Sequence, residues 1–170
     1  GFSSSGRAQG RPDGGRLRQI THFGNGFAGN ASWSPTGRQI AFERGFPDRA
    51  GIYTMKPDGS AIRSLTPRGF QGQPAYSPDG TRIVYERTVG HPGKRDFDDA
   101  LWTMDTHGRH LRRITAPLPP GTRDFPCAGA PEWSPVARSI AIATTVVRHP
   151  AGHAHNAHVH VPTGPPHPRP

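Results

Sequence analysis

Short apolar runs alternate with polar turns along most of the chain, and residues 33–66 hold the clearest example. Within this span, residues 40–42 and 52–55 are too short for helices and consist mainly of residues that favour strands. The turns between the runs read Ser-Pro-Thr-Gly and Pro-Asp-Gly-Ser, in which proline sets φ at one position and glycine accepts a positive φ at another. The pattern predicts an antiparallel meander of four short strands.

The same arrangement of runs and turns occurs again further along the chain. Residues 76–85 repeat the first half of the unit, and residues 101–115 repeat the second half. Residues 12–21 match the last turn and strand of a unit, so the chain opens in the middle of one. Four-stranded repeats of ~40 to 45 residues are the blades of a β-propeller. The sequence therefore predicts an all-β fold, a partial β-propeller of about three four-stranded blades with the last one incomplete and with disordered termini.

The repeat divides the chain into segments. We expect residues 1–11 to be a disordered linker, 12–21 to end a preceding blade, and 22–66 and 67–115 to form two blades. Residues 116–147 form a partial blade, because Val136 and Ala137 replace the Asp-Gly of the turn. The His- and Pro-rich composition of residues 148–170 predicts a disordered tail. We interpret the chain as a fragment, whose tail is either native or the product of a truncated or frame-shifted coding end.

The motifs of the repeat match a known type. They read Trp-Ser-Pro, Ile-Ala-Phe, Ile-Tyr-x-Met, Asp-Gly-Ser and Leu-Thr over residues 33–66. This series resembles the WD40-like propeller repeat of TolB and its relatives, and the resemblance covers residues 12 to about 143. The same repeat type occurs in the propellers of prolyl oligopeptidase-type and tricorn-type peptidases. The resemblance implies a propeller fold and a periplasmic or other extracytoplasmic location, while the sequence displays no targeting segment.

Composition narrows the function classes. The formal net charge is +9, but the cations are nearly all arginine and are spread through the repeats, so we expect no nucleic-acid partner. No apolar run approaches the ~18 residues that would span a membrane, and we expect no membrane insertion. Cys127 is the only cysteine, which excludes a disulfide within the chain.

Catalytic and metal-binding motifs are weak or absent in the sequence. Ser3 to Ser5 lack the Gly-x-Ser-x-Gly spacing of a nucleophile elbow, and there is no phosphate-binding glycine loop. Glu43 and Glu86 occupy equivalent positions after a strand and are interpreted as repeat residues, although paired acids for glycoside chemistry stay open. We expect no cofactor and no metal site. The segment Asp96-Phe97-Asp98-Asp99 is interpreted as a solvated charged loop, because the calcium-loop spacing is missing. A flexible run of neutral imidazoles can bind nickel, copper or zinc loosely, and the tail contains such a run: His149, His153, His155, His158, His160 and His167.

The connections between blades and strands are the expected place of function, because loops on a rigid scaffold usually carry recognition. In a four-stranded meander, the loops between second and third strands lie on one face with the blade crossovers, and they are longer and rich in phenylalanine here. We predict a non-catalytic scaffold that binds a protein partner or ligand through these loops, with packing of each phenylalanine on its own blade as the competing interpretation. The alternative function is the substrate-screening propeller of a prolyl oligopeptidase-type serine peptidase whose hydrolase domain is absent. The candidate binding residues are Phe27, Phe46, Phe70, Lys94, Arg95, Asp96, Phe97 and Arg123.

Equivalent aromatic residues close the strands of each copy. Trp33, Tyr76 and Trp133 end the first strand, and we expect all three to be buried between neighbouring sheets. Because the third blade is partial, Trp133 is expected to contribute less stability than the others. Unpaired blade edges also predict self-association of the chain, since exposed strand edges template pairing with a second copy.

Overall fold

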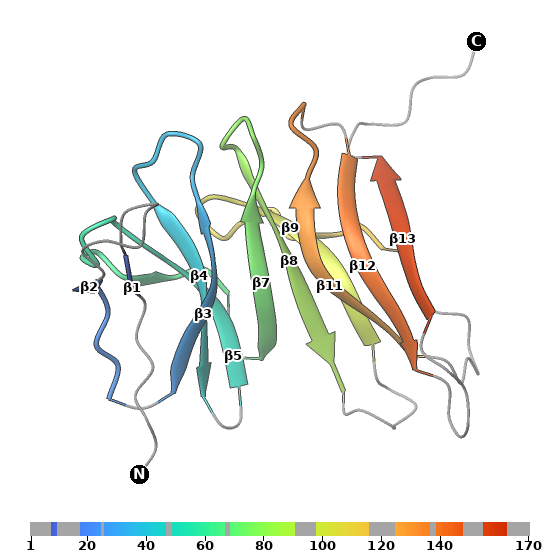
Figure 1. Ribbon diagram of the computed structural model, residues 1–170, viewed down its shortest axis with the longest axis horizontal. Coiled ribbons are helices and arrows are strands. Elements are labelled where there is room, and N and C mark those ends of the chain that lie inside the picture. The colour runs from blue at the N-terminus through green and yellow to red at the C-terminus, as the bar shows by residue number, and fades with distance from the viewer. Residues whose placement is uncertain are drawn as a thin grey trace.

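The computed structural model describes residues 8–9, 18–24, 26–46, 49–66, 69–90, 98–115, 125–136, 139–147 and 155–162. All regular structure in these ranges is β-strand, and the strands form a row of twisted sheets placed side by side (Figure 1). The row begins with the pair β1 (Ala8–Gln9) and β2 (Arg18–Gln19). The first blade is β3 (Phe27–Trp33), β4 (Ile40–Phe46), β5 (Arg49–Met55) and β6 (Arg63–Ser64), the second is β7 (Phe70–Tyr76), β8 (Arg82–Val89), β9 (Asp98–Asp105) and β10 (Arg112–Arg113), and the third is β11 (Phe125–Trp133), β12 (Ser139–Val147) and β13 (His155–Pro162).

Each blade is an antiparallel meander in which consecutive strands pair. A single parallel residue pair, Ala50 with Phe70, joins β5 of the first blade to β7 of the second, so that the two blades form one 8-stranded sheet by hydrogen bonding. The described sheets form an open row and do not close into a ring. The structure thus confirms the predicted all-β partial propeller. None of the described residues lies in a helix long and apolar enough to cross a lipid bilayer.

The tight turns form where proline, aspartate and glycine predicted them. In the turn between β5 and β6, the amide of Gly59 donates to the carbonyl of Lys56 at 2.9 Å, and Gly59 has a φ of 86° that glycine adopts without strain. The carboxylate of Asp58 accepts the amide of Ser60 at 2.8 Å. The hydroxyl of Ser60 holds the pKa of Asp58 below its usual range. These contacts are local, which explains why the turns could be predicted from the sequence.

The apolar core lies between blades, because alternate side chains of one strand point to opposite neighbours. On β4, Ile40 and Phe42 face residues 20–23, whereas Ala41 faces the second blade. The same alternation on β8 places Tyr85 against the first blade and Val84 against the third. The clusters among the described residues are Ile20, Phe23, Ile40, Phe42 and Met55; then Ala41, Ile52, Leu65, Tyr76, Ile83, Tyr85 and Met104; then Val84, Leu101, Trp133, Ile140 and Ile142.

The aromatic residues that close the inner strands are not equally buried, contrary to the sequence-based expectation. Tyr76 and Trp133 are buried, with Trp133 only 9% exposed, whereas Trp33 is 47% exposed. The reason is that each of these rings packs on the blade before its own: the indole Nε1 of Trp133 donates to the carbonyl of Ala75 on β7 at 3.1 Å, and the hydroxyl of Tyr76 donates to Gln39 at 3.1 Å. The described residues contain no inner strand ahead of β3 to cover Trp33. An incomplete third blade therefore does not weaken the packing of Trp133.

Two segments expected to be disordered contain strands. β1 lies within residues 1–11 and pairs with β2 in the same register that β5 and β6 use, so β1 is equivalent to the third strand of a blade. β13 lies within residues 148–170 and pairs along its length with β12. Its register places Val159 opposite Ile142 and Val161 opposite Ile140. Alternating valines of this kind favour a strand, whereas the prediction of disorder used only the His- and Pro-rich composition of the tail. The rest of the tail lies outside the described residues.

Candidate functional site

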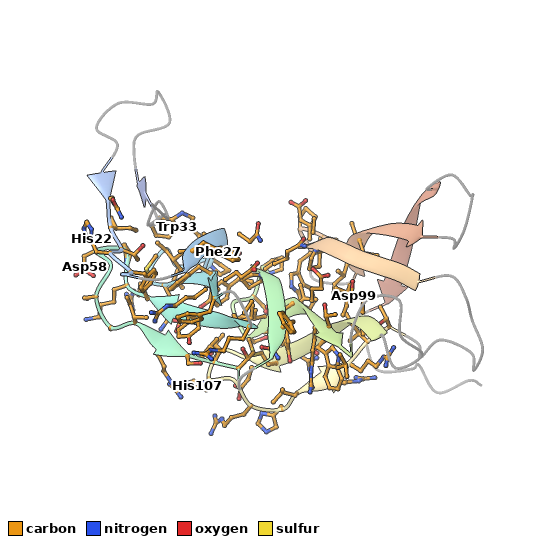
Figure 2. The ribbon with its side chains drawn as sticks, turned by 90° about the horizontal axis from the view of Figure 1, so that it is seen from below. His22, Phe27, Trp33, Asp58, Asp99 and His107 are labelled. Carbon is orange, nitrogen blue, oxygen red and sulfur yellow. The ribbon has the colours of Figure 1, made fainter. Side chains whose placement is uncertain are left out.

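The lower end of the row in Figure 1 carries the hairpin between β4 and β5, and the inner strands β3 and β7 also begin at this end, as their registers require. Two of the candidate binding residues lie there. Phe27 starts β3 and is 42% exposed, and Phe70 starts β7 and is 47% exposed. Figure 2, which views the molecule from this side, shows Phe27 on the first blade. Two equivalent phenylalanines of neighbouring blades thus present apolar surface at one end of the molecule, which we call the hairpin face.

Phe46 also lies at the hairpin face, but its environment differs, because two arginines stack on it. The guanidinium carbons of Arg44 and Arg49 each lie 4.8 Å from the centroid of the Phe46 ring. Arg44 lies in addition 4.2 Å from the ring centroid of Phe23 and 5.6 Å from that of Tyr53. Cation–π contacts at such distances are attractive. Phe46 is therefore half-buried within an arginine–aromatic cluster rather than presented alone.

A cavity of about 360 Å³ opens beside this cluster. None of the described residues that line it is acidic, and two of them are arginines. The Nε atom of Arg44 is buried and has no hydrogen-bond partner among the described residues. We call this cavity the arginine pocket; its lining residues are Arg44, Phe46, Arg49, Ala50, Gly51, Tyr53, Ser64 and Thr66.

Each inner strand carries a bulge at the same position, where a residue other than glycine takes a positive φ. These residues are Asn30, Gln73 and Ala130, with φ values of 45°, 51° and 46°. The amide nitrogen of the Asn30 side chain donates to Glu43 at 2.7 Å, and that of Gln73 donates to Glu86 at 2.7 Å. The Gln73 side-chain oxygen also accepts the backbone amide of Ala130 in the third blade. The bulges thus aim polar side chains at a carboxylate on the second strand of each complete blade.

The half-buried Glu86 and the buried Asp99 form a pair of carboxyl groups on the side of the second blade that faces β11–β13. Burial, together with the negative charge of Asp99 and its hydrogen bond, raises the pKa of Glu86 to about 8. The hydroxyl of Thr88 donates to Asp99 at 3.1 Å. The interpretation of Asp99 as part of a solvated loop is therefore wrong, because Asp99 is a buried residue of β9.

The opposite end of the second blade holds a cavity of about 420 Å³ beside the turn that follows β9. Asp105 dominates this turn, because its carboxylate accepts the backbone amides of His107 and Arg109, each at 2.8 Å. Its carboxylate also lies 3.2 Å from Nε of Arg109 and 3.1 Å from Nδ1 of His110. These donors hold the pKa of Asp105 well below its usual range, with the backbone amide of Arg109 as the largest cause. Groups of the same turn thus supply the hydrogen bonds and the positive charge that the Asp105 carboxylate needs, so we interpret Asp105 as a residue that stabilises the turn.

The structure brings together part of the predicted site and adds residues that the sequence analysis missed. Phe27, Phe46 and Phe70 lie at the hairpin face, whereas Lys94, Arg95, Asp96, Phe97 and Arg123 lie outside the described residues. The missed residues are Arg44 and Arg49, whereas Glu86 was interpreted as a repeat residue and Asp99 as part of a solvated loop. A signal existed for the arginines, because Arg44 and Phe46 alternate along β4 and so share one side of the strand. Among the described residues, no group of three or more His, Cys, Asp or Glu side chains is placed to hold a metal ion.

Comparisons with known proteins reach the fold through structure alone. No protein-family model matches the sequence, and no curated protein matches it. A putative TolB from Agrobacterium tumefaciens superposes with a TM-score of 0.61 at 20% identity, over 88% of this chain and 55% of that one. TolB from Acinetobacter baumannii gives a TM-score of 0.56 at 20% identity, over 88% and 36% of the two chains. A prolyl endopeptidase structure gives 0.61 at 14% identity, over 89% and 23%.

These likenesses define the class of protein: the chain is a row of β-propeller blades. The particular propellers that it resembles are of the TolB type, as the repeat motifs indicated. At 20% identity the likeness shows the fold, and the chain spans about half of one TolB structure and about a third of the other.

Proposed function

We propose that the chain is a non-catalytic scaffold, similar to TolB-type proteins, that binds a protein partner or ligand at its hairpin face. The observation that carries this proposal is the pair Phe27 and Phe70, which expose 42% and 47% of their surface at equivalent positions of adjacent blades. Exposed apolar residues that share one face of a protein mark interaction sites more often than residues scattered singly do. The resemblance to TolB supports a periplasmic or other extracytoplasmic location.

The surroundings of Glu86 and Asp99 support a structural role for these two acids. Glu86 accepts a hydrogen bond from the side-chain amide of Gln73, and Asp99 accepts one from the hydroxyl of Thr88, so both carboxyl groups are bonded to other residues of the protein. A general acid or base must instead lie within hydrogen-bond distance of the substrate atom to or from which it transfers a proton. The acids thus fit a network that ties neighbouring blades together, and the proposal assigns no catalytic residue to the described part of the chain.

A second candidate function is the substrate-screening propeller of a prolyl oligopeptidase-type peptidase, which the likeness to a prolyl endopeptidase structure favours. In that case the binding face would serve a hydrolase domain. Reading the genomic frame on both sides of this segment separates the two functions. A downstream Gly-x-Ser-x-Gly motif would decide for the peptidase, whereas further blades or an upstream TolB-like amino-terminal domain would decide for the scaffold.

The binding proposal is tested by changing the hairpin face and the opposite end separately. The double variant Phe27→Ser with Phe70→Ser removes the apolar pair, and Val136→Ser removes an exposed apolar residue from the turn after β11, at the other end of the blades. Quantitative affinity capture from an envelope extract of the source organism should retain a set of partners with the unmodified chain and with Val136→Ser, and lose that set with the double variant. Equal capture by all three proteins would refute binding through the hairpin face.

A further inference from the structure

We propose that the arginine pocket of the first blade binds a carboxylate group, supplied by an acidic side chain or by the free carboxyl terminus of a peptide. This inference rests on the proposed function, because it names the chemistry of a ligand at the hairpin face. The pocket and the exposed phenylalanines involve different residues, so each can be tested alone.

Aromatic rings hold the guanidinium of Arg44 in place. Its central carbon lies 4.2 Å from the ring centroid of Phe23 and 4.8 Å from that of Phe46. Contacts of this kind restrict the planar group while leaving donor atoms at its edge for other partners. The Nε donor at that edge is buried without a hydrogen-bond partner among the described residues. A buried charged donor without an acceptor is unfavourable, and an anion beside the same guanidinium would offset that penalty.

The charge of the pocket selects an anion. Arg44 and Arg49 both line the cavity, and none of the described lining residues carries a negative charge. A guanidinium presents its donors in a planar fork that matches the two oxygens of a carboxylate, and such paired hydrogen bonds are stronger than those between neutral groups. The rings of Phe46 and Tyr53 provide apolar walls for the carbon atoms next to that carboxylate.

The size of the cavity limits the ligand. About 360 Å³ lies at the lower end of the range for small-molecule sites, which fits one carboxylate with its neighbouring residue. Gly51 forms part of the lining, and a β-carbon at this position would lie 3.3 Å from the Thr66 hydroxyl oxygen and 3.4 Å from Cε2 of Tyr53. The absence of a side chain at Gly51 therefore keeps this part of the cavity open.

The second blade repeats the stacked arginine of the pocket but not its charge. Arg87 occupies the position equivalent to Arg44 and lies 4.8 Å from the ring centroid of Trp102. However, the residue pair that ends the strands, Phe46 with Arg49 in the first blade, is Val89 with Asp98 in the second. The second blade thus repeats the stacked arginine without the second cation and with an acidic residue in its place. Arg87 is therefore a matched control for Arg44.

The experiment is a titration of the full chain, followed by nuclear magnetic resonance of the backbone amides of Gly51 and Tyr53. Three probes are used. N-acetyl-alanine has a terminal carboxylate, and N-acetyl-aspartic acid α-amide has only a side-chain carboxylate. N-acetyl-alanine amide has neither. We expect saturable shifts with at least one carboxylate probe and none with the amide. The probe that binds more tightly tells a carboxyl terminus from an acidic side chain.

The variants assign the binding to the pocket. Arg44→Gln should weaken the tighter carboxylate probe about tenfold or more, as expected for a charged hydrogen-bonded pair. Arg87→Gln should leave its affinity unchanged, and Gly51→Ala should weaken binding while both arginines remain. If Arg44→Gln does not fold, Arg49→Gln replaces it. Absence of saturable binding, equal binding of the amide probe, or equal losses for Arg44→Gln and Arg87→Gln would each overturn the proposal. If the phenylalanine double variant loses partner capture but still binds the carboxylate probe, the phenylalanine pair and the arginine pocket bind independently of each other.

Discussion

Replacing Trp133 should destabilise the chain far more than replacing its repeat equivalent Trp33. Trp133 is 9% exposed and packs with Val84 and Leu101 of the second blade, whereas Trp33 is 47% exposed. Trp133→Ala also removes the hydrogen bond from the indole to the carbonyl of Ala75. The two substitutions are chemically identical, so any difference between them reports the packing that the neighbouring blade provides.

The expected magnitudes follow from the burial of each ring. Truncating a buried tryptophan typically costs ~3 to 5 kcal/mol, because a cavity adds to the lost transfer free energy. The lost hydrogen bond of Trp133 adds about 1 kcal/mol. Trp33 keeps about half of its surface in water, and its removal leaves no enclosed cavity, so Trp33→Ala should cost less than ~2 kcal/mol.

Urea denaturation followed by far-ultraviolet circular dichroism measures this difference without relying on tryptophan fluorescence. With a slope of ~1 to 3 kcal/mol per molar for a small protein, the two alanine variants should have midpoints that differ by about 1 M or more. Trp133→Phe keeps an apolar ring and should fall between them, which maintains a graded test if Trp133→Ala does not fold. Equal midpoints for the two alanine variants, or a larger loss for Trp33→Ala, would refute the packing of each inner-strand aromatic on the preceding blade.

Three further predictions concern the acid pair, a tight turn and the last strand. Because burial raises the pKa of Glu86 from an ordinary 4.5 to about 8, its contribution to stability is fully present below pH 4.5 and is lost as the pH rises towards 8; Glu86→Gln should flatten this part of the profile of melting temperature against pH, and an unchanged profile would count against the buried pair. Gly59→Ala should destabilise more than Gly37→Ala in thermal melts, since both have positive φ but only a β-carbon at Gly59 would collide with the carbonyl oxygen of Ile20; similar losses would show that backbone strain alone matters. Hydrogen exchange should be slowed at backbone amides of β13 that bond to β12, and rapid exchange across residues 155–162 would contradict the strand.

The sequence by itself determined the strands, the turns and the repeat. Pro57, Asp58 and Gly59 specify a turn through contacts within a few residues, and the short apolar runs specify strands through their period of two. Because these features are local, the sequence also predicted how the strands of one blade pair and which end of the blades carries the hairpin between β4 and β5.

Only the tertiary structure decided which equivalent residues differ in environment. Trp33 and Trp133 occupy the same position in the repeat, yet one is exposed and the other buried, because burial depends on the blade that lies ahead. The sequence suggested that Asp99 belongs to a charged loop. In the structure, the register of β9 with β8 places Asp99 in the sheet, where it interacts with Glu86.

The same reason applies to the binding site and the last strand. In the arginine pocket, Arg44 from β4 stacks on Phe23, which lies between β2 and β3. The spacing of these two residues in the sequence does not predict that contact. The composition of β13 resembles that of a disordered segment, and its strand depends on β12 to supply the pairing edge. Local patterns thus specified the blades, whereas contacts between distant segments set the burial, charge and chemistry on which function depends.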